Sequence, residues 1–263
     1  MRLTFRLPRN SLVFAGLATW GVLLVSCVVA NRALLVPPQI AGATIVGSAS
    51  CAKCHASITR GIHDATHARL ALKGDDGQMK NVACESCHGG GSLHIKEGTP
   101  GTILNPKVSP ETCLQCHVNA RSEFSLPYTH PVLSGKIACT QCHEPHQGEA
   151  NPMAGGARTL MTAANQTCAK CHPAQSGPFT FVHEVMREGC VTCHSPHGSV
   201  NDKMLKSRNV SLCYQCHFQP QNSTTQIVHG GLDHSQNVNR GTCWSAGCHE
   251  AIHGSHVNSN LRY

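Results

Sequence analysis

The sequence predicts a mostly irregular, elongated fold with short α-helices, negligible sheet and four similar units. Three observations lead to this prediction. One Cys-rich motif recurs eight times between residues 51 and 249. The 263 residues include 24 Gly and 14 Pro, which interrupt regular secondary structure. Helical periodicity nowhere extends beyond about two or three turns. We therefore expect each motif to lie on a short helix, with long coil between the motifs.

The repeated motif reads Cys-x-x-Cys-His in seven copies, and the eighth copy, Cys243-Trp244-Ser245-Ala246-Gly247-Cys248-His249, is longer by two residues. Two such cysteines can form thioethers with the vinyl groups of a haem, and the adjoining histidine binds the iron. The motifs use 16 of the 17 cysteines and leave only Cys27. Structural disulfides, zinc sites or a thioredoxin-like motif would not place a histidine after every second cysteine. The sequence therefore predicts eight covalently bound c-type haems.

The residues of these haem sites follow directly from the motif. The haem-binding cysteines are Cys51, Cys54, Cys84, Cys87, Cys113, Cys116, Cys139, Cys142, Cys168, Cys171, Cys190, Cys193, Cys213, Cys216, Cys243 and Cys248. The proximal iron ligands are His55, His88, His117, His143, His172, His194, His217 and His249. In the eighth motif the two additional residues must bulge outward, and Gly247 gives the backbone the freedom to do so.

The remaining histidines recur at regular distances from the motifs. Eleven of the 19 histidines lie outside the motifs. One follows each odd-numbered proximal histidine by 11 to 13 residues, and one follows each even-numbered proximal histidine by three to six. The methionines show no comparable register, so we predict these eight histidines as distal ligands: His67, His94, His130, His146, His183, His197, His229 and His253. His63, His234 and His256 are left as spares.

The sequence leaves open which distal histidine binds which iron. His146 and His197 follow their own proximal histidines by only three residues. They start on the proximal side of their own haem, so they reach a neighbouring haem more easily and would tie units together.

The motifs group into pairs, which predicts an array of four two-haem units beginning near Cys51, Cys113, Cys168 and Cys213. Residues 1–33 are predicted to be an export or anchor segment, 34–50 a linker, 51–256 the octahaem domain and 257–263 a tail. The stretches Ile95–Glu111 and Gly148–Gln166 are expected to connect units or to drape over haem edges. Roughly 30 residues per haem cannot build a large side-chain core, so buried porphyrin must replace it.

The formal charge of +7 does not indicate a nucleic-acid-binding protein. Three of the positive charges, Arg2, Arg6 and Arg9, belong to the first ten residues, Met1–Asn10. Sixteen haem propionates, together with one positive charge on each oxidised iron porphyrin, would bring the remaining protein to about −4 with every iron oxidised and about −12 with every iron reduced. The basic residues are expected to balance propionates, and no basic stripe with interleaved aromatic residues is present.

The N-terminus predicts export. Met1–Asn10 carries three Arg and no acidic residue, and Leu12–Ala30 has no charge over 19 residues. Three interpretations stay open: an uncleaved membrane anchor, cleavage near Val28-Val29-Ala30, or a lipoprotein signal with Cys27 as the lipidated residue. Cys27 could equally be a small apolar residue in a buried helix. Each of the three places the haem domain in the periplasm, and the anchor or a lipid on Cys27 would also attach it to a membrane.

Three segments resemble the repeat of periplasmic multihaem cytochromes of the MtrA/DmsE/PioA type. They are His130-Pro131-Val132 with Gly135 to Cys139 and His143-Glu144-Pro145-His146; Gly189-Cys190 with His194-Ser195-Pro196-His197-Gly198; and the ending from Cys243 to His256. The resemblance covers about residues 51 to 256. It implies an extended wire of bis-histidine haems, commonly seated in an outer-membrane β-barrel porin, that passes electrons between the periplasm and an external partner. This chain has eight motifs where the named relatives carry ten.

The favoured function is an electron-transfer conduit between redox protein donors and acceptors, with no catalytic residue. Two alternatives belong to other classes. A quinol-oxidising cytochrome would use the N-terminal segment as an inner-membrane anchor, whereas the conduit is expected at the outer membrane. A multihaem reductase of a nitrogen or sulfur oxyanion would need an iron with an open coordination position. The chain has enough histidines to close all eight irons.

Overall fold

The computed structural model describes residues 39–62, 66–73, 79–81, 83–146, 165–218, 226–238, 241–245 and 247–263. The chain divides into two compact parts, Met1–Val36 and Pro37–Tyr263; the four two-motif units all lie in the second part. The predicted export or anchor segment, Cys27 and His63 lie outside the described residues, as does most of the predicted connection between residues 148 and 166.

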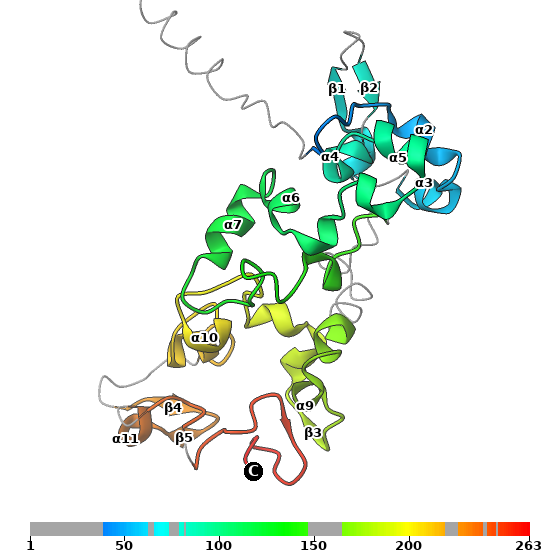
Figure 1. Ribbon diagram of the computed structural model, residues 1–263. Coiled ribbons are helices and arrows are strands. Elements are labelled where there is room, and N and C mark those ends of the chain that lie inside the picture. Colours follow the sequence, from blue (N-terminus) through cyan, green and yellow to red (C-terminus); the bar gives the residue numbers. More distant parts are fainter. Residues whose placement is uncertain are drawn as a thin grey trace, which may run out of the picture. The chain divides into compact units, whose positions relative to one another are not determined.

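Within the described ranges the helices are short and separated by irregular chain (Figure 1), as predicted. The longest, α3 and α7, have seven residues each. The α-helices are α2 (Ser48–Ala52), α3 (Ala56–Ile62), α4 (Glu85–His88), α5 (Ser92–Glu97), α6 (Glu111–Leu114), α7 (Val118–Phe124), α9 (Pro173–Ser176), α10 (Val210–Cys213) and α11 (Ser235–Val238). Single 3₁₀ turns occupy Thr66–Arg69, Pro100–Thr102, Pro106–Val108, Cys139–Gln141, Glu184–Arg187, Cys190–Thr192 and Asp202–Met204. No described helix is long and apolar enough to cross a membrane.

The strands of the described ranges form three small two-stranded antiparallel pairs. β1 (Ala71–Lys73) pairs with β2 (Met79–Asn81), and β4 (Val228–His229) pairs with β5 (Leu232–Asp233). The third pair joins distant parts of the chain, because β3 (Phe181–Val182) pairs with β6 (Gly254–Ser255). A short bridge likewise joins Tyr128 to Ser199. The β3–β6 pair and the Tyr128–Ser199 bridge therefore connect neighbouring two-motif units. The described residues contain almost no other sheet.

All eight motifs close the same backbone ring. In each of the seven regular copies the histidine N–H donates to the carbonyl of the first cysteine at 2.9–3.0 Å. The eighth copy makes this bond across two additional residues, from the N–H of His249 to the carbonyl of Cys243 at 2.9 Å. The extra length is taken up where Gly247 adopts φ +78°, a conformation that glycine reaches without steric cost. The stretched motif therefore presents its cysteines and histidine on the same backbone closure as the other seven.

The described residues bury very little apolar side chain. The buried apolar residues among them are Ile62, Ala83, Leu114, Val132, Leu205 and Ala251. A globular chain of this length normally buries well over half of its surface around one continuous core. The protein atoms of the described residues supply no such core, which agrees with a fold organised around large bound groups.

Glu85 is a buried anchor inside the second motif. Its side chain is 1% exposed. Its carboxylate accepts hydrogen bonds from the N–H groups of Val46 at 2.8 Å, Gly47 at 2.7 Å and Gly91 at 2.9 Å. Hydrogen bonds to a charged group contribute roughly 1.5–3 kcal/mol each. Glu85 thus joins the chain ahead of the first motif to the second motif.

Candidate haem sites

Seven of the eight motif histidines face a second histidine at nearly constant spacing. The ring centres lie 6.0–6.3 Å apart in every pair. Two metal–imidazole bonds of roughly 2 Å each, plus about 1 Å from each bonding nitrogen to its ring centre, give about 6 Å. The gap between the rings therefore fits one iron held by an imidazole on each side.

The seven facing rings all belong to the histidines predicted as distal ligands. The pairs are His55–His94, His88–His146, His117–His67, His143–His197, His172–His130, His194–His253 and His217–His183. Only the first pair lies within one two-motif unit. In the other six, neighbouring units exchange histidines in both directions: the first unit presents His67 to His117 of the second, and the second presents His146 to His88 of the first.

His249 departs from this arrangement. Among the described residues no ring lies opposite it at the common spacing, and the predicted His229 instead faces His234 at 6.0 Å. The ring of His229 also packs on Tyr214 at 4.8 Å. The structure therefore places seven of the eight predicted distal histidines opposite a motif histidine, and among the described residues His249 has no ring opposite it.

Five of the facing histidines, together with His249, share one hydrogen-bonding pattern. Their Nδ1 atoms contact a backbone carbonyl, which can only accept, so Nδ1 carries the proton and Nε2 keeps a free lone pair. The contacts are His88 to Leu104 at 2.9 Å, His94 to Thr99 at 3.0 Å, His130 to Pro196 at 2.7 Å, His183 to Ile252 at 2.9 Å, His194 to Lys203 at 2.8 Å and His249 to Asn260 at 2.6 Å. Metal-binding histidines typically show this orientation.

Three of the rings that face a motif histidine are kept neutral by their surroundings. Burial lowers the pKa of His67, His183 and His253 below the ordinary histidine value. The facing motif histidine lowers each pKa further. Neutral imidazole is the form that binds a metal ion, so the electrostatics agree with the ring geometry.

The first cysteines of the two motifs in each unit contact each other. The thiol pairs are Cys51–Cys84, Cys113–Cys139, Cys168–Cys190 and Cys213–Cys243. Each hydrogen bond raises the pKa of the first partner. It lowers the pKa of the second to about 6 in Cys84, Cys139 and Cys243. In Cys190 the same bond lowers the pKa to about 7. The two attachment points of each unit are therefore neighbours.

The second cysteines approach each other across unit boundaries. Burial is the main cause that raises the pKa of Cys87, Cys142 and Cys193. A cysteine of the next unit raises each pKa further through its charge; these are Cys116, Cys171 and Cys216 respectively. Hydrogen-bonded thiols within units thus alternate with thiols that influence each other through charge between units, in the order of the sequence.

Comparisons with known proteins agree with this arrangement. Residues 130–177 and 183–221 match the family described as "Doubled CXXCH motif", and residues 39–89 match "Cytochrome c554 and c-prime". The chain is 30% identical over 190 residues to the multihaem cytochrome MtrA of Shewanella baltica, covering 71% of this chain and 54% of that protein. The chain is a multihaem c-type cytochrome of the MtrA type.

More distant similarities involve longer cytochromes. The cytochrome is 24% identical over 229 residues to the C-type polyhaem cytochrome OmcB of Geobacter sulfurreducens, which covers 84% of this chain and 29% of OmcB. An undecahaem cytochrome from the S-layer of Carboxydothermus ferrireducens is 22% identical, over 62% of this chain and 28% of that one, with a TM-score of 0.16. The cytochrome thus spans about half the length of MtrA and under a third of OmcB.

The structure adds residues that the motif pattern could not mark. The predicted connection Ile95–Glu111 runs back to the second motif, where Leu104 N–H donates to the His88 carbonyl at 3.1 Å and Leu104 O accepts from the His88 ring. The predicted tail supplies Asn260 O, which accepts from His249 at 2.6 Å. Every residue has a backbone carbonyl, so the residue type at position 260 does not indicate this contact. Only the short distance in sequence between the tail and the last motif could have indicated that Asn260 O accepts from His249.

The equal backbone closure of all eight motifs leads to a prediction of stoichiometry. We expect the intact mass of the denatured protein to correspond to eight covalent haems, including one on the stretched motif. The matched variant Cys243→Ala/Cys248→Ala should lose the mass of one haem and keep seven. A native mass corresponding to seven haems would contradict the assignment of the last motif.

Proposed function

We propose that this cytochrome is an electron-transfer conduit in which eight haems follow one another in sequence order. The alternating thiol contacts carry the proposal. Contacts between first cysteines join the two motifs of every unit, and the approach of second cysteines joins each unit to the next. Every haem attached to these thiols would lie beside the haem of the preceding motif. An electron could then enter at one end of the series and leave at the other, with no bond made or broken.

The ring pairs support a complete set of axial ligands for seven irons. In each pair the protein would hold one iron between two neutral imidazoles, and the carbonyl contacts would fix the ring orientation. Closed coordination at every iron leaves no position for substrate, so electron transfer without catalysis is the function that this set favours. The haem itself supplies the one-electron redox couple.

For the eighth iron we propose His234 as the distal ligand in preference to His229. The Nδ1 atom of His234 contacts the Leu232 carbonyl at 2.9 Å, the pattern that five facing histidines and His249 show. The Nδ1 atom of His229 is buried and has no hydrogen-bond partner in the described residues. His234 also lies close to the eighth motif. The pKa of Cys243 is lowered mainly by a hydrogen bond with Cys213. The charges of His249 and, to a smaller extent, His234 lower this pKa further.

This assignment predicts different outcomes for two neighbouring histidines. His234→Ala should create one high-spin haem among eight, because the eighth iron loses its sixth ligand. His229→Ala should leave the oxidised protein entirely low-spin. Electron paramagnetic resonance and the visible absorption of the oxidised protein would measure both. The reverse outcome would assign the eighth iron to His229, and a high-spin haem in the native protein would favour an iron open to substrate.

The sequence and the similarity to MtrA support a proposal for the location and the partners. Export through the N-terminal segment would place the haem domain in the periplasm, in association with a membrane. Redox proteins would donate and accept electrons at the two ends of the series. We propose an outer-membrane β-barrel porin as a partner that would hold the cytochrome across the membrane. An inner-membrane anchor formed by the N-terminal segment is the alternative arrangement.

Reconstitution tests the conduit role. Liposomes are loaded with a reducible dye, the cytochrome is inserted together with a candidate porin, and a reductant that cannot cross the bilayer is added outside. We expect the dye to be reduced only when the cytochrome is present, with porin-only liposomes as the control. If the dye stays oxidised while every haem is reduced and the complex is verified, the transmembrane role fails and a periplasmic shuttle is favoured.

A further inference from the structure

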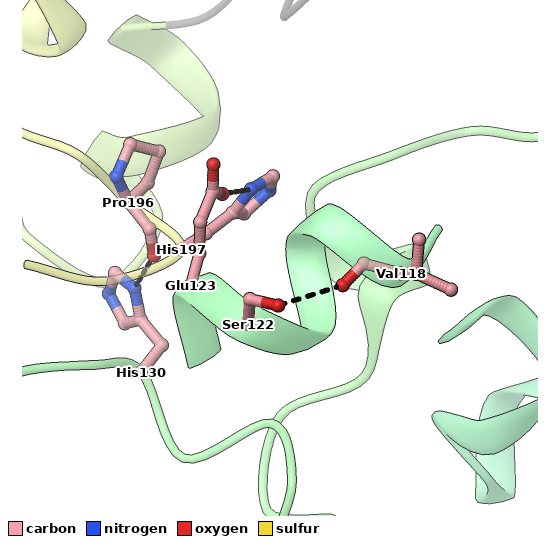
Figure 2. Close-up of polar contacts among 6 residues, drawn as sticks. All are labelled: Val118, Ser122, Glu123, His130, Pro196 and His197. Atoms are coloured by element: carbon pink, nitrogen blue, oxygen red, sulfur yellow. Dashed lines mark hydrogen bonds and ion pairs between the residues drawn. The ribbon is translucent and has the colours of Figure 1, made fainter. Parts of the chain in front are cut away.

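His197 differs from the other facing histidines in the group that accepts its Nδ1 proton. Five of them, and His249 as well, donate to backbone carbonyls. His197 instead donates to the Glu123 carboxylate, Nδ1 to Oε2, at 2.7 Å. Figure 2 shows the two side chains pointing toward each other, with the His130–Pro196 contact beside them. A full negative charge therefore lies directly behind the ring that faces His143.

Glu123 and His197 come from different units, and the backbone holds them in place. Glu123 lies in the last turn of α7, and the neighbouring Phe124 ring packs on His197 at 5.0 Å. Tyr128 and Ser199 exchange hydrogen bonds in both directions, at 3.2 and 2.9 Å. The backbone of Gly198 lies so close to that of Glu123 that a Cβ on Gly198 would be 2.0 Å from the Glu123 carbonyl oxygen. The geometry of the carboxylate and the ring is thus set by packing on both sides.

The nearest comparable contact in the described residues is weaker. Glu144 approaches the Nδ1 atom of His146, but the distance is 3.5 Å. The same carboxylate accepts a hydrogen bond from the His146 backbone N–H at 3.1 Å. Glu144 is therefore occupied by its own loop, whereas the Glu123 carboxylate is aligned on the ring nitrogen of His197.

A carboxylate that accepts the Nδ1 proton makes the imidazole a stronger donor to a metal. It also places negative charge near the iron. Both effects favour the ferric state, which carries one more positive charge than the ferrous state. Second-layer hydrogen bonding is one of the means by which a protein sets the potential of a haem. A carbonyl acceptor lacks the full charge, so the effect should be specific to the site that His143 and His197 form.

We propose that Glu123 lowers the reduction potential of the fourth haem, the one held between His143 and His197, below the value its ligands alone would give. Glu123 is a positioning residue, because it acts through His197. The proposal rests on the conduit proposed above, in which this haem is an interior stop. This haem would accept one electron from a neighbouring haem and pass one electron to the next, so electron transfer through it would need no other reactant. A low potential at that stop would make it the uphill step of the path.

The variant Glu123→Gln tests this. Its amide oxygen can still accept the Nδ1 proton, while the charge is removed. In a spectroelectrochemical titration of the complete protein we expect seven of the eight one-electron steps to stay in place. The remaining step should shift upward, so that at a fixed potential the ratio of reduced to oxidised haem at that site rises by about tenfold, which is 59 mV for a one-electron couple.

Glu111→Gln is the matched control, because it removes one carboxylate that pairs with Arg121 and has no contact with a histidine ring. Its titration should overlay the native one. If E123Q also overlays the native curve, the proposal is wrong. A high-spin haem in E123Q would equally overturn it, since the carboxylate would then serve to hold the ring in place.

If E123Q does not yield the protein with eight haems, Glu123→Asp supplies the test. Its shorter side chain keeps the charge but lengthens the contact, so a smaller upward shift of the same step is expected, and an unchanged titration would overturn the proposal. The readout is separate from the liposome experiment. A conduit that fails to reduce the enclosed dye would leave the shift in potential intact, and an unshifted titration would leave the conduit intact.

Discussion

Replacing His183 by alanine should convert one haem of eight to the high-spin state while all eight remain attached. The His183 ring faces His217 at 6.0 Å, and its Nδ1 contacts the Ile252 carbonyl at 2.9 Å. Its pKa is lowered, mainly by burial, so the ring is neutral and its Nε2 is available. Removing the ring would leave only His217 to bind the iron of the seventh motif, whereas the cysteines that would attach the haem are unchanged.

The spectral change should be large because loss of the sixth ligand would convert a low-spin haem to a high-spin haem, with no intermediate case.

His256→Ala provides the matched control. The His256 ring lies in the same region, against Phe179 at 5.4 Å, and faces no motif histidine in the described residues. Its spectrum should equal the native one. If the H183A protein stays entirely low-spin, His183 is not a ligand and the ring-pair assignment loses its support.

The second large effect concerns the apoprotein. Chain produced without haem attachment should be unfolded, because the described residues bury only six apolar side chains. Ordering the backbone costs roughly 1–2 kcal/mol per residue. The described helices have at most seven residues, and helices shorter than about 12 residues are marginal on their own. Haem burial would have to supply the missing stabilisation.

Far-ultraviolet circular dichroism during thermal unfolding measures this. We expect a featureless curve for the apoprotein and a cooperative transition for the protein with eight haems. The apoprotein should also be cleaved rapidly by a protease under conditions that leave the holoprotein intact. A cooperative transition in the apoprotein would show that side-chain packing alone specifies the fold.

Much of the architecture could be predicted because the chemistry fixes the residues. Two cysteines and a histidine at constant spacing impose one backbone closure, which the stretched motif from Cys243 to His249 also makes. The short helices and negligible sheet follow from the turn-forming residues between motifs and are confirmed in the described residues. The eight haems, the axial ligands and the unit boundaries are predictions that the spectra and masses described above would test.

Other features depend on contacts that a periodic pattern cannot contain. Nothing in the sequence distinguishes Glu85 or Glu123 from the other acidic residues, because their roles depend on backbone N–H groups and a ring brought in from distant segments. His234 lies outside the 11-to-13-residue register, so the sequence pattern does not predict it as a ligand. Its contact with the Leu232 carbonyl becomes visible only in three dimensions.

The central claim is that the haems form one unbranched series in sequence order. Locating the eight irons of the holoprotein by anomalous X-ray scattering, or by cryo-electron microscopy of its complex, tests this claim directly. The account predicts that the nearest neighbours of each interior iron are those of the preceding and following motifs, with the irons of His55 and His249 at the two ends. An iron separated from its sequence neighbours, or a branch at any motif, would contradict it.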